Sequence, residues 1–217
     1  MNMKIDQHVI SWPCFSEYEI VTAPNGKRYI RPTEKSTSYR FHYRVEREQR
    51  VIDAVNVGML VLGKKSETVI ETAVLDFVSK HGLLGLMTAL KEYAEPYDWV
   101  VDQFKDWAYM VSSCYFFYKD GLVTDLKLRI SMQEGMEAYG GVAPSHIILL
   151  REKPTLWWHF HSLHQCIHLT LSFMLADENN PLRMCKYCKK IYLAGTTEDE
   201  WFCSEKCKNA YEKNGDQ

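Results

Sequence analysis

The amino-acid sequence predicts an α+β fold that is mainly helical, with a small β-hairpin or sheet at the N-terminus. Three observations lead to this expectation: strand-type alternation around an Asn-Gly turn, apolar residues at helical spacing further on, and four cysteines near the C-terminus. Residues 1–181 should form one body, β-rich over 1–50 and helical over 51–178. Residues 182–217, the C-terminal module, are too few to build a hydrophobic core and need another source of stability, such as a metal ion or disulfides.

The composition is that of an ordinary globular chain. Of 217 residues, 46% are hydrophobic and 25% charged, which excludes a wholly disordered or collagen-like protein. The net charge of −2 argues against a nucleic-acid binder that is basic over its whole surface. No apolar run is long enough for a membrane span, and the N-terminus has no apolar leader, so we expect a cytoplasmic protein.

The β-rich region is expected to begin with a hairpin. Residues 19–23 and 27–30 are typical of strands, and Asn25-Gly26 between them tolerates the positive φ angles of a tight turn. A third strand is predicted over residues 38–45, where aromatic and cationic side chains alternate and therefore occupy opposite faces. The aromatic face should pack on the core.

The hydrophobic period becomes helical from about residue 46. Residues 67–80 carry apolar side chains at helix spacing, with Ser66 as a candidate N-cap and Gly82 as a candidate stop. Two further helices are expected over residues 103–119 and 124–139.

A longer helix is predicted before the C-terminal module. Residues 145–151 form a short strand or lead into that helix. Pro154 suits its first turn, where the N–H that proline lacks would have no helical partner, and the helix should end near Ala176. The polar run at 177–181 marks the boundary.

The C-terminal cysteines have the spacing of a metal site. The knuckle pair Cys185 and Cys188 can wrap backbone around a metal, and Cys203 and Cys207 lie one helical turn apart, so that their sulfurs face the same side. Four thiolates make a closed tetrahedral site, and we expect all four cysteines to bind one structural Zn²⁺. Two disulfides, a redox Cys-x-x-Cys and iron in the same cage are the alternatives.

The segments RMCKYCKKIYL (183–193), WFCS (201–204) and CKNA (207–210) resemble treble-clef zinc fingers of the CGNR type and related bacterial and phage fingers. This resemblance implies a treble-clef zinc module in a stress-linked transcription regulator that contacts DNA through the finger. The chain departs from the pattern at 207–210, where Gly and Arg of the family motif are absent. Its last two cysteines are spaced by three residues instead of four.

The charge of the module limits its affinity for nucleic acid. Residues 183–213 hold seven cations and five anions, and four thiolates with one Zn²⁺ bring the total to about zero. A small cationic patch survives as a candidate contact, with Lys186, Lys189 and Lys190 beside the knuckle and Lys208 after the last cysteine. Docking on the body or capping its core is the alternative role.

The N-terminal strands offer a second electrostatic candidate. Residues 27–50 hold eight cations and three anions, and Arg40, His42 and Arg44 share one face of the third predicted strand. That face can bind phosphate or an acidic partner. The simpler interpretation is an edge strand whose solvated cations deter edge pairing.

Histidines gather within the predicted helix that ends near Ala176. His161, His164 and His168 lie at i, i+3 and i+7, a spacing that allows a second metal or catalytic site. No glutamate lies between His164 and His168, so the zinc-protease motif is absent. The alternative is a helix flank whose imidazoles are hydrogen-bonded, beside a buried stripe formed by Leu156, Phe160, Leu163, Ile167 and Met174.

No motif for covalent catalysis or phosphate cradling is present, and no catalytic residue is assigned. We therefore expect a non-enzymatic zinc-binding regulator whose partner is nucleic acid or a protein. A protein-interaction or dimerisation module with purely structural zinc is the alternative, and a homo-oligomer is compatible with it. A metal-dependent enzyme using the three histidines is the third hypothesis.

Overall fold

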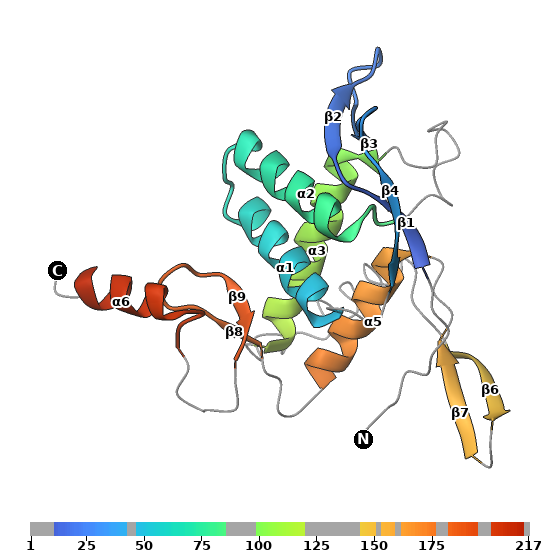
Figure 1. Cartoon of the computed structure of the whole chain (residues 1–217). Coiled ribbons are helices and arrows are strands. Elements are labelled where there is room, and N and C mark those ends of the chain that lie inside the picture. Colours follow the sequence, from blue (N-terminus) through green and yellow to red (C-terminus); the bar gives the residue numbers. More distant parts are fainter. Residues whose placement is uncertain are drawn as a thin grey trace.

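A computed structural model confirms a mainly helical α+β architecture with small N-terminal hairpins and a C-terminal hairpin followed by a helix (Figure 1). The structure describes residues 11–42, 47–85, 99–119, 144–150, 153–158, 162–176, 182–194 and 201–214. Its helices are α1 (Arg47–Leu62), α2 (Glu67–His81), α3 (Val101–Lys119), α5 (Leu163–Ala176) and α6 (Glu205–Asn214). Its strands are β1 (Ser11–Phe15), β2 (Tyr18–Thr22), β3 (Arg28–Pro32), β4 (Ser38–His42), β5 (Trp99–Val100), β6 (Pro144–Leu150), β7 (Lys153–Trp158), β8 (Leu182–Met184) and β9 (Ile191–Leu193).

The predicted hairpin is confirmed. β2 and β3 pair antiparallel, and Gly26 in the turn has φ of 78°. The strand predicted after the hairpin does not extend it, since β4 pairs with β1, a strand that the sequence analysis did not predict. The short β5 forms the third strand of the hairpin's sheet instead. Alternation along β4 identifies a strand but carries no information about its partner.

Helices α1, α2, α3 and α5 enclose the core. The aromatic rings of Phe77, Phe104 and Trp107 meet edge to face at its centre, with centroids 5.4 to 6.2 Å apart. Gly82 ends α2 as predicted, with φ of 87° and its N–H bonded to the Val78 carbonyl. Ser66 occupies the N-cap position, but its side chain makes no capping hydrogen bond.

The long helix predicted from Pro154 to Ala176 is wrong in its first part. Residues 153–158 form β7, which pairs antiparallel with β6, and the helix begins only at Leu163. Leu156 therefore belongs to a strand and not to the buried helical stripe. The apolar run of β6 needs a strand partner, and the β-branched and aromatic residues of β7 provide one. Proline is tolerated at the start of a two-stranded ribbon because one edge of each strand is unpaired. The helix predicted over 124–139 and the position of Phe160 lie outside the described residues.

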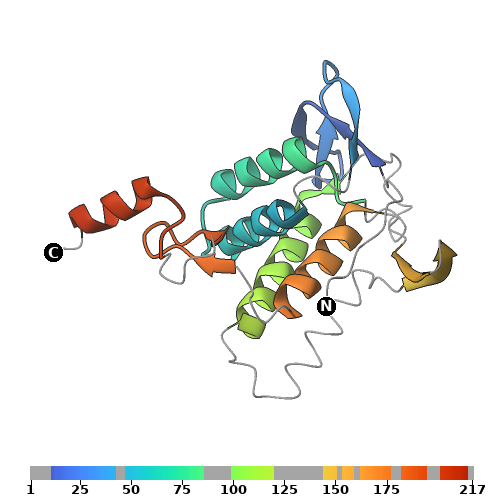
Figure 2. The same ribbon diagram turned by 60° about the horizontal axis from the view of Figure 1, so that its bottom comes forward.

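The C-terminal module is continuous with the body's core. Leu182 and Ile191 are 0% and 2% exposed and belong to the same buried cluster as the helices. Figures 1 and 2 show α6 extending away from the helical body, whereas β8 and β9 lie against it. Within the described ranges, no helix is long and apolar enough to cross a membrane.

Candidate metal centre

The hairpin β8–β9 positions the first pair of cysteines. Its two strands pair antiparallel, and Cys185 and Cys188 lie in the turn between them. The Cys185 N–H donates to the Lys190 carbonyl, and the Lys189 N–H donates to the Cys185 carbonyl. Lys189 has φ of 61°, the left-handed conformation that lets the chain reverse tightly. This backbone folds around the two sulfurs as a metal knuckle does.

The first turn of α6 positions the second pair. Ser204 caps the helix, since its hydroxyl accepts the Cys207 N–H at 3.3 Å. Cys203 precedes the helix and Cys207 lies within it. The Lys186 N–H donates to the Trp201 carbonyl at 2.9 Å, which ties the knuckle to the start of the helix.

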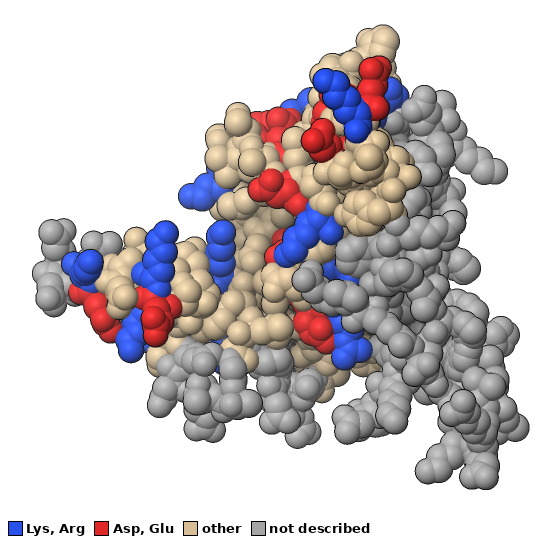
Figure 3. Space-filling model, in the orientation of Figure 1, with Lys and Arg blue, Asp and Glu red and all other residues tan. Residues whose placement is uncertain are grey.

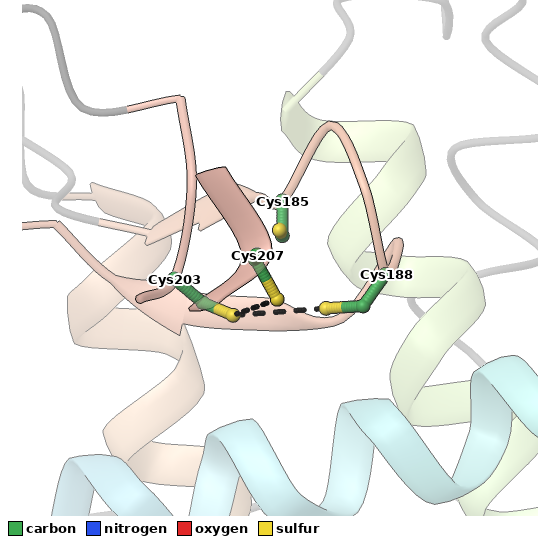
Figure 4. Close-up of side chains that lie close together, drawn as sticks. All are labelled: Cys185, Cys188, Cys203 and Cys207. Carbon is green, nitrogen blue, oxygen red and sulfur yellow. Dashed lines mark hydrogen bonds between the residues drawn. The ribbon is translucent and has the colours of Figure 1, made fainter. Parts of the chain in front are cut away.

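The four sulfurs converge on one point (Figure 4). All lie within 4.8 Å of one another, and Cys203 Sγ is 3.6 Å from Cys188 Sγ and 3.5 Å from Cys207 Sγ. A tetrahedral site with metal–sulfur bonds of about 2.3 Å has sulfur–sulfur edges of about 3.8 Å. The arrangement could therefore hold one metal ion, and zinc suits four thiolates. All seven cysteines are free thiols, so the two-disulfide alternative does not describe this structure.

The surroundings of the cysteines give the thiols of the cluster different pKa values. Burial raises the pKa of Cys185, but hydrogen bonds from the backbone of residues 203, 188 and 187 outweigh it and lower that pKa to about 6. Burial and the neighbouring thiols raise the pKa of Cys203 to about 12. Four adjacent thiolates repel one another, so full ionisation of the cluster requires a cation at its centre.

An asparagine on α1 docks the module onto the body. Asn56 Nδ2 donates to the Ile191 carbonyl at 3.1 Å, and the Ile191 N–H donates to Asn56 Oδ1 at 2.8 Å. The amide thus imitates a neighbouring strand at β9. Asn56 was not among the predicted site residues, although an asparagine within the apolar run of α1 could have suggested a specific polar contact.

Replacing Asn56 with alanine should loosen the module, because it leaves the buried Ile191 backbone groups without these partners. We expect a loss of about 2–3 kcal/mol in the free energy of opening at β9. Hydrogen exchange of the Ile191 amide would measure it. Asn56→Asp keeps an acceptor for the Ile191 N–H but places a second acceptor oxygen against the Ile191 carbonyl, so its Ile191 amide should be protected less than in wild type and more than in Asn56→Ala. Equal protection of the amide in wild type and Asn56→Ala would contradict the docking role.

Two of the three predicted histidines lie together in the core. His164 and His168 on α5 are 5% and 4% exposed, whereas His161 lies outside the described residues. Trp107 Nε1 donates to His168 Nε2 at 2.9 Å, and His164 Nδ1 lies 2.7 Å from Ser162 Oγ. In the described part of the chain, the four cysteines are the one group of three or more residues with metal-binding geometry.

The stability of the fold should fall in mild acid because of His168. An indole N–H can only donate, so His168 Nε2 must be unprotonated. Burial, with His164 nearby, lowers the pKa of His168 to about 3. The unfolded imidazole takes a proton near pH 6.5, so the unfolded state gains about 1.4 kcal/mol per pH unit below that value.

Urea unfolding at pH 6.5 and pH 4.5 would test this dependence. Wild type should lose roughly 2 kcal/mol more than His168→Gln, whose side-chain oxygen can still accept the indole N–H. His168→Phe, which also cannot titrate, should behave as the glutamine variant does. The same loss in all three proteins would exclude His168 as the cause.

Strand β4 and the C-terminal module, which carry the two predicted sets of cations, lie on different sides of the helical body (Figures 1 and 2). Arg40 and His42 are on β4, and Arg44 lies outside the described residues. Tyr39, expected on the core face of that strand, is 42% exposed. The module carries Lys186, Lys189, Lys190 and Lys208.

Comparison with family models, curated proteins and solved structures finds no match to the chain. The resemblance to the CGNR type therefore has no family match behind it. The cysteine cluster by itself suggests a zinc-binding module.

Proposed function

We propose that Cys185, Cys188, Cys203 and Cys207 bind one structural Zn²⁺, and that the zinc-held module is the nucleic-acid contact of a non-enzymatic regulator. The observation that carries the zinc site is the convergence of four sulfurs within 4.8 Å. With four protein ligands the metal has no open position, so its role is to hold shape and not to catalyse. The likeness to treble-clef fingers of the CGNR type supports the regulator class.

The surface of the module supports contact with nucleic acid. Residues 183–213 hold seven cations and five anions, and three of the cations, Lys186, Lys189 and Lys190, lie together beside the knuckle. Tyr187, Trp201 and Tyr211 are 42%, 54% and 43% exposed, and the Lys186 ammonium lies 3.7 Å from the centre of the Trp201 ring. Figure 3 shows Lys and Arg side chains on the module, with Asp and Glu side chains between them. Exposed aromatic rings beside cations bind unpaired bases by stacking while the cations meet the phosphates.

Single-stranded oligonucleotide binding by the metal-loaded protein tests this proposal. Trp201→Ala removes a stacking ring and should weaken binding about tenfold, since one base–aromatic stack contributes about 1–3 kcal/mol. Lys186→Glu should weaken binding and reduce its salt dependence. Tyr109→Ala, which removes a ring 48% exposed on α3, is the matched control. Equal affinity of Trp201→Ala and Tyr109→Ala would refute the contact.

A protein-interaction module is the second candidate function. The observation that favours it is the apolar surface of the hairpin, where Met184 and Leu193 are 46% and 40% exposed. Such side chains suit a protein surface better than a phosphate backbone. Sedimentation of the metal-loaded protein would reveal self-association through this surface, and Met184→Glu should then abolish it.

A further inference from the structure

A cleft of about 840 Å³ lies beside the contact of Asn56 with Ile191, lined by helices α1 and α2 on one side and by the knuckle and β9 on the other. Its apolar lining includes Ile52, Leu60 and Phe77 on the helices and Ile191 on β9. Figure 3 shows the notch between body and module, with Lys or Arg side chains on both sides of it. The volume falls within the range of about 300–1,000 Å³ that holds small ligands or short chain segments, and not a folded domain.

Four lysines and two aspartates line the described part of the cleft, and the four thiolates with one bound Zn²⁺ would add a charge of −2 at the end lined by Cys188 and Cys203. Asp53 is already satisfied, because Lys80 Nζ, His81 Nε2 and Gln49 Nε2 all lie 2.7 to 2.8 Å from its carboxylate oxygens. Burial raises the pKa of Asp53, but these three contacts outweigh it and lower that pKa to about 2. This carboxylate therefore stays ionised, and its charge is balanced by Lys80 within the wall of the cleft.

Three other lysines line the cleft from both walls. Lys65 follows α1, whereas Lys189 and Lys190 come from the knuckle. Among the described residues, no carboxylate lies within ion-pair distance of any of the three. Asp76 is the one remaining acidic group in the described lining. An apolar floor between cationic walls is complementary to an anionic occupant with an apolar side chain.

We propose that this cleft binds an acidic peptide segment of a protein partner, with an apolar side chain on the floor and carboxylates at Lys65, Lys189 and Lys190. A peptide fits better than a nucleic acid, because the partly buried apolar side chains of the floor, such as Leu60 and Ala73, are aliphatic, and Phe77 is 3% exposed, which leaves no open ring on which a base can stack.

The peptide site rests on the zinc-held module of the proposed function. Cys188 and Cys203 line the cleft, and the wall formed by β9 is held in place by the contact between Asn56 and Ile191. Loss of the metal would release the knuckle and with it two of the three lysines. Peptide binding should therefore require the metal.

Fluorescence anisotropy of the metal-loaded protein tests the site, with a labelled peptide of glutamate and aspartate around a central leucine as the probe. Lys65→Glu should weaken binding about tenfold. Lys64→Glu places the same charge in the same turn but outside the lining, so it should change little. Ala73→Phe fills the cleft and should abolish binding, whereas Thr72→Phe, on the preceding residue of α2 and outside the lining, should not. A peptide with lysines in place of the acids should not bind.

Three outcomes would overturn the proposal: no binding of the acidic peptide, equal effects of Lys65→Glu and Lys64→Glu, or displacement of the peptide by a single-stranded oligonucleotide whose own binding depends on Lys65. Retention of peptide by the chelated protein would refute the metal requirement. The metal content and the Trp201→Ala result report separately on the proposed function. One equivalent of zinc and a Trp201-dependent oligonucleotide contact, without peptide binding, would reject the peptide site alone.

Discussion

Replacing Cys188 with serine is expected to release the metal and unfold the C-terminal module, because metal affinity is folding free energy in a segment of this size. The effect should reach the body. Leu182 and Ile191 are buried in the same core as the helices, and each contributes roughly 1.5–3 kcal/mol by its burial. When the module unfolds, both contributions are lost, together with the hydrogen bonds between Asn56 and Ile191. We therefore expect the whole protein to lose roughly 3–6 kcal/mol.

Elemental analysis, limited proteolysis and thermal unfolding would measure these effects together. Wild type should hold one equivalent of zinc and resist cleavage within residues 182–214. Cys188→Ser should hold none, be cleaved there and unfold at a lower temperature. Cys114→Ala, which removes a buried thiol of α3 far from the cluster in sequence, should keep its zinc. A Cys188→Ser protein that retains the metal and the protease resistance would refute the structural role of the site, and iron in place of zinc would refute the choice of metal.

Short-range features of the sequence predicted the parts of the fold that depend on neighbouring residues. Asn25-Gly26 located the first hairpin because its positive φ angles are a local requirement. Gly82 located the end of α2 for the same reason. The spacing of Cys185, Cys188, Cys203 and Cys207 located the cluster, since a knuckle and a helical turn each bring two sulfurs together without help from the rest of the chain.

Features that depend on distant partners were missed. Pro154 is compatible with the first turn of a helix and with the start of a strand, and its pairing with Leu149 on β6 decides between them. β4 pairs with a strand that lies far upstream, and the docking of β9 depends on Asn56, 135 residues before Ile191. The helical stripe of histidines was visible in the sequence. The indole of Trp107, which fixes the protonation state of His168, comes from another helix.

Gly58→Ala is expected to destabilise the fold strongly, although alanine is the better helix former. Gly58 lies on α1 where it crosses α3, and a Cβ added there would overlap the Ala108 carbonyl oxygen and the Ser112 hydroxyl. The Ala108 oxygen belongs to the backbone and cannot move away without shifting the helix. The Ser112 hydroxyl donates to the Val55 carbonyl at 2.7 Å, so that contact would be strained as well.

Helix propensity favours alanine over glycine by about 1 kcal/mol. Overpacking against backbone opposes it by roughly 3 kcal/mol or more, so the clash decides the sign. We expect Gly58→Ala to lose at least about 2 kcal/mol, which for a chain of this length lowers Tm by roughly 4–8 °C. Gly63→Ala is the control, because its added Cβ would lie 3.1 Å from the nearest atom, the Met59 carbonyl oxygen, and should change stability by less than about 1 kcal/mol. Greater stability of Gly58→Ala than of wild type would show that α1 and α3 do not approach this closely, and the positions of Asn56 and of the module docked on it would then also need revision.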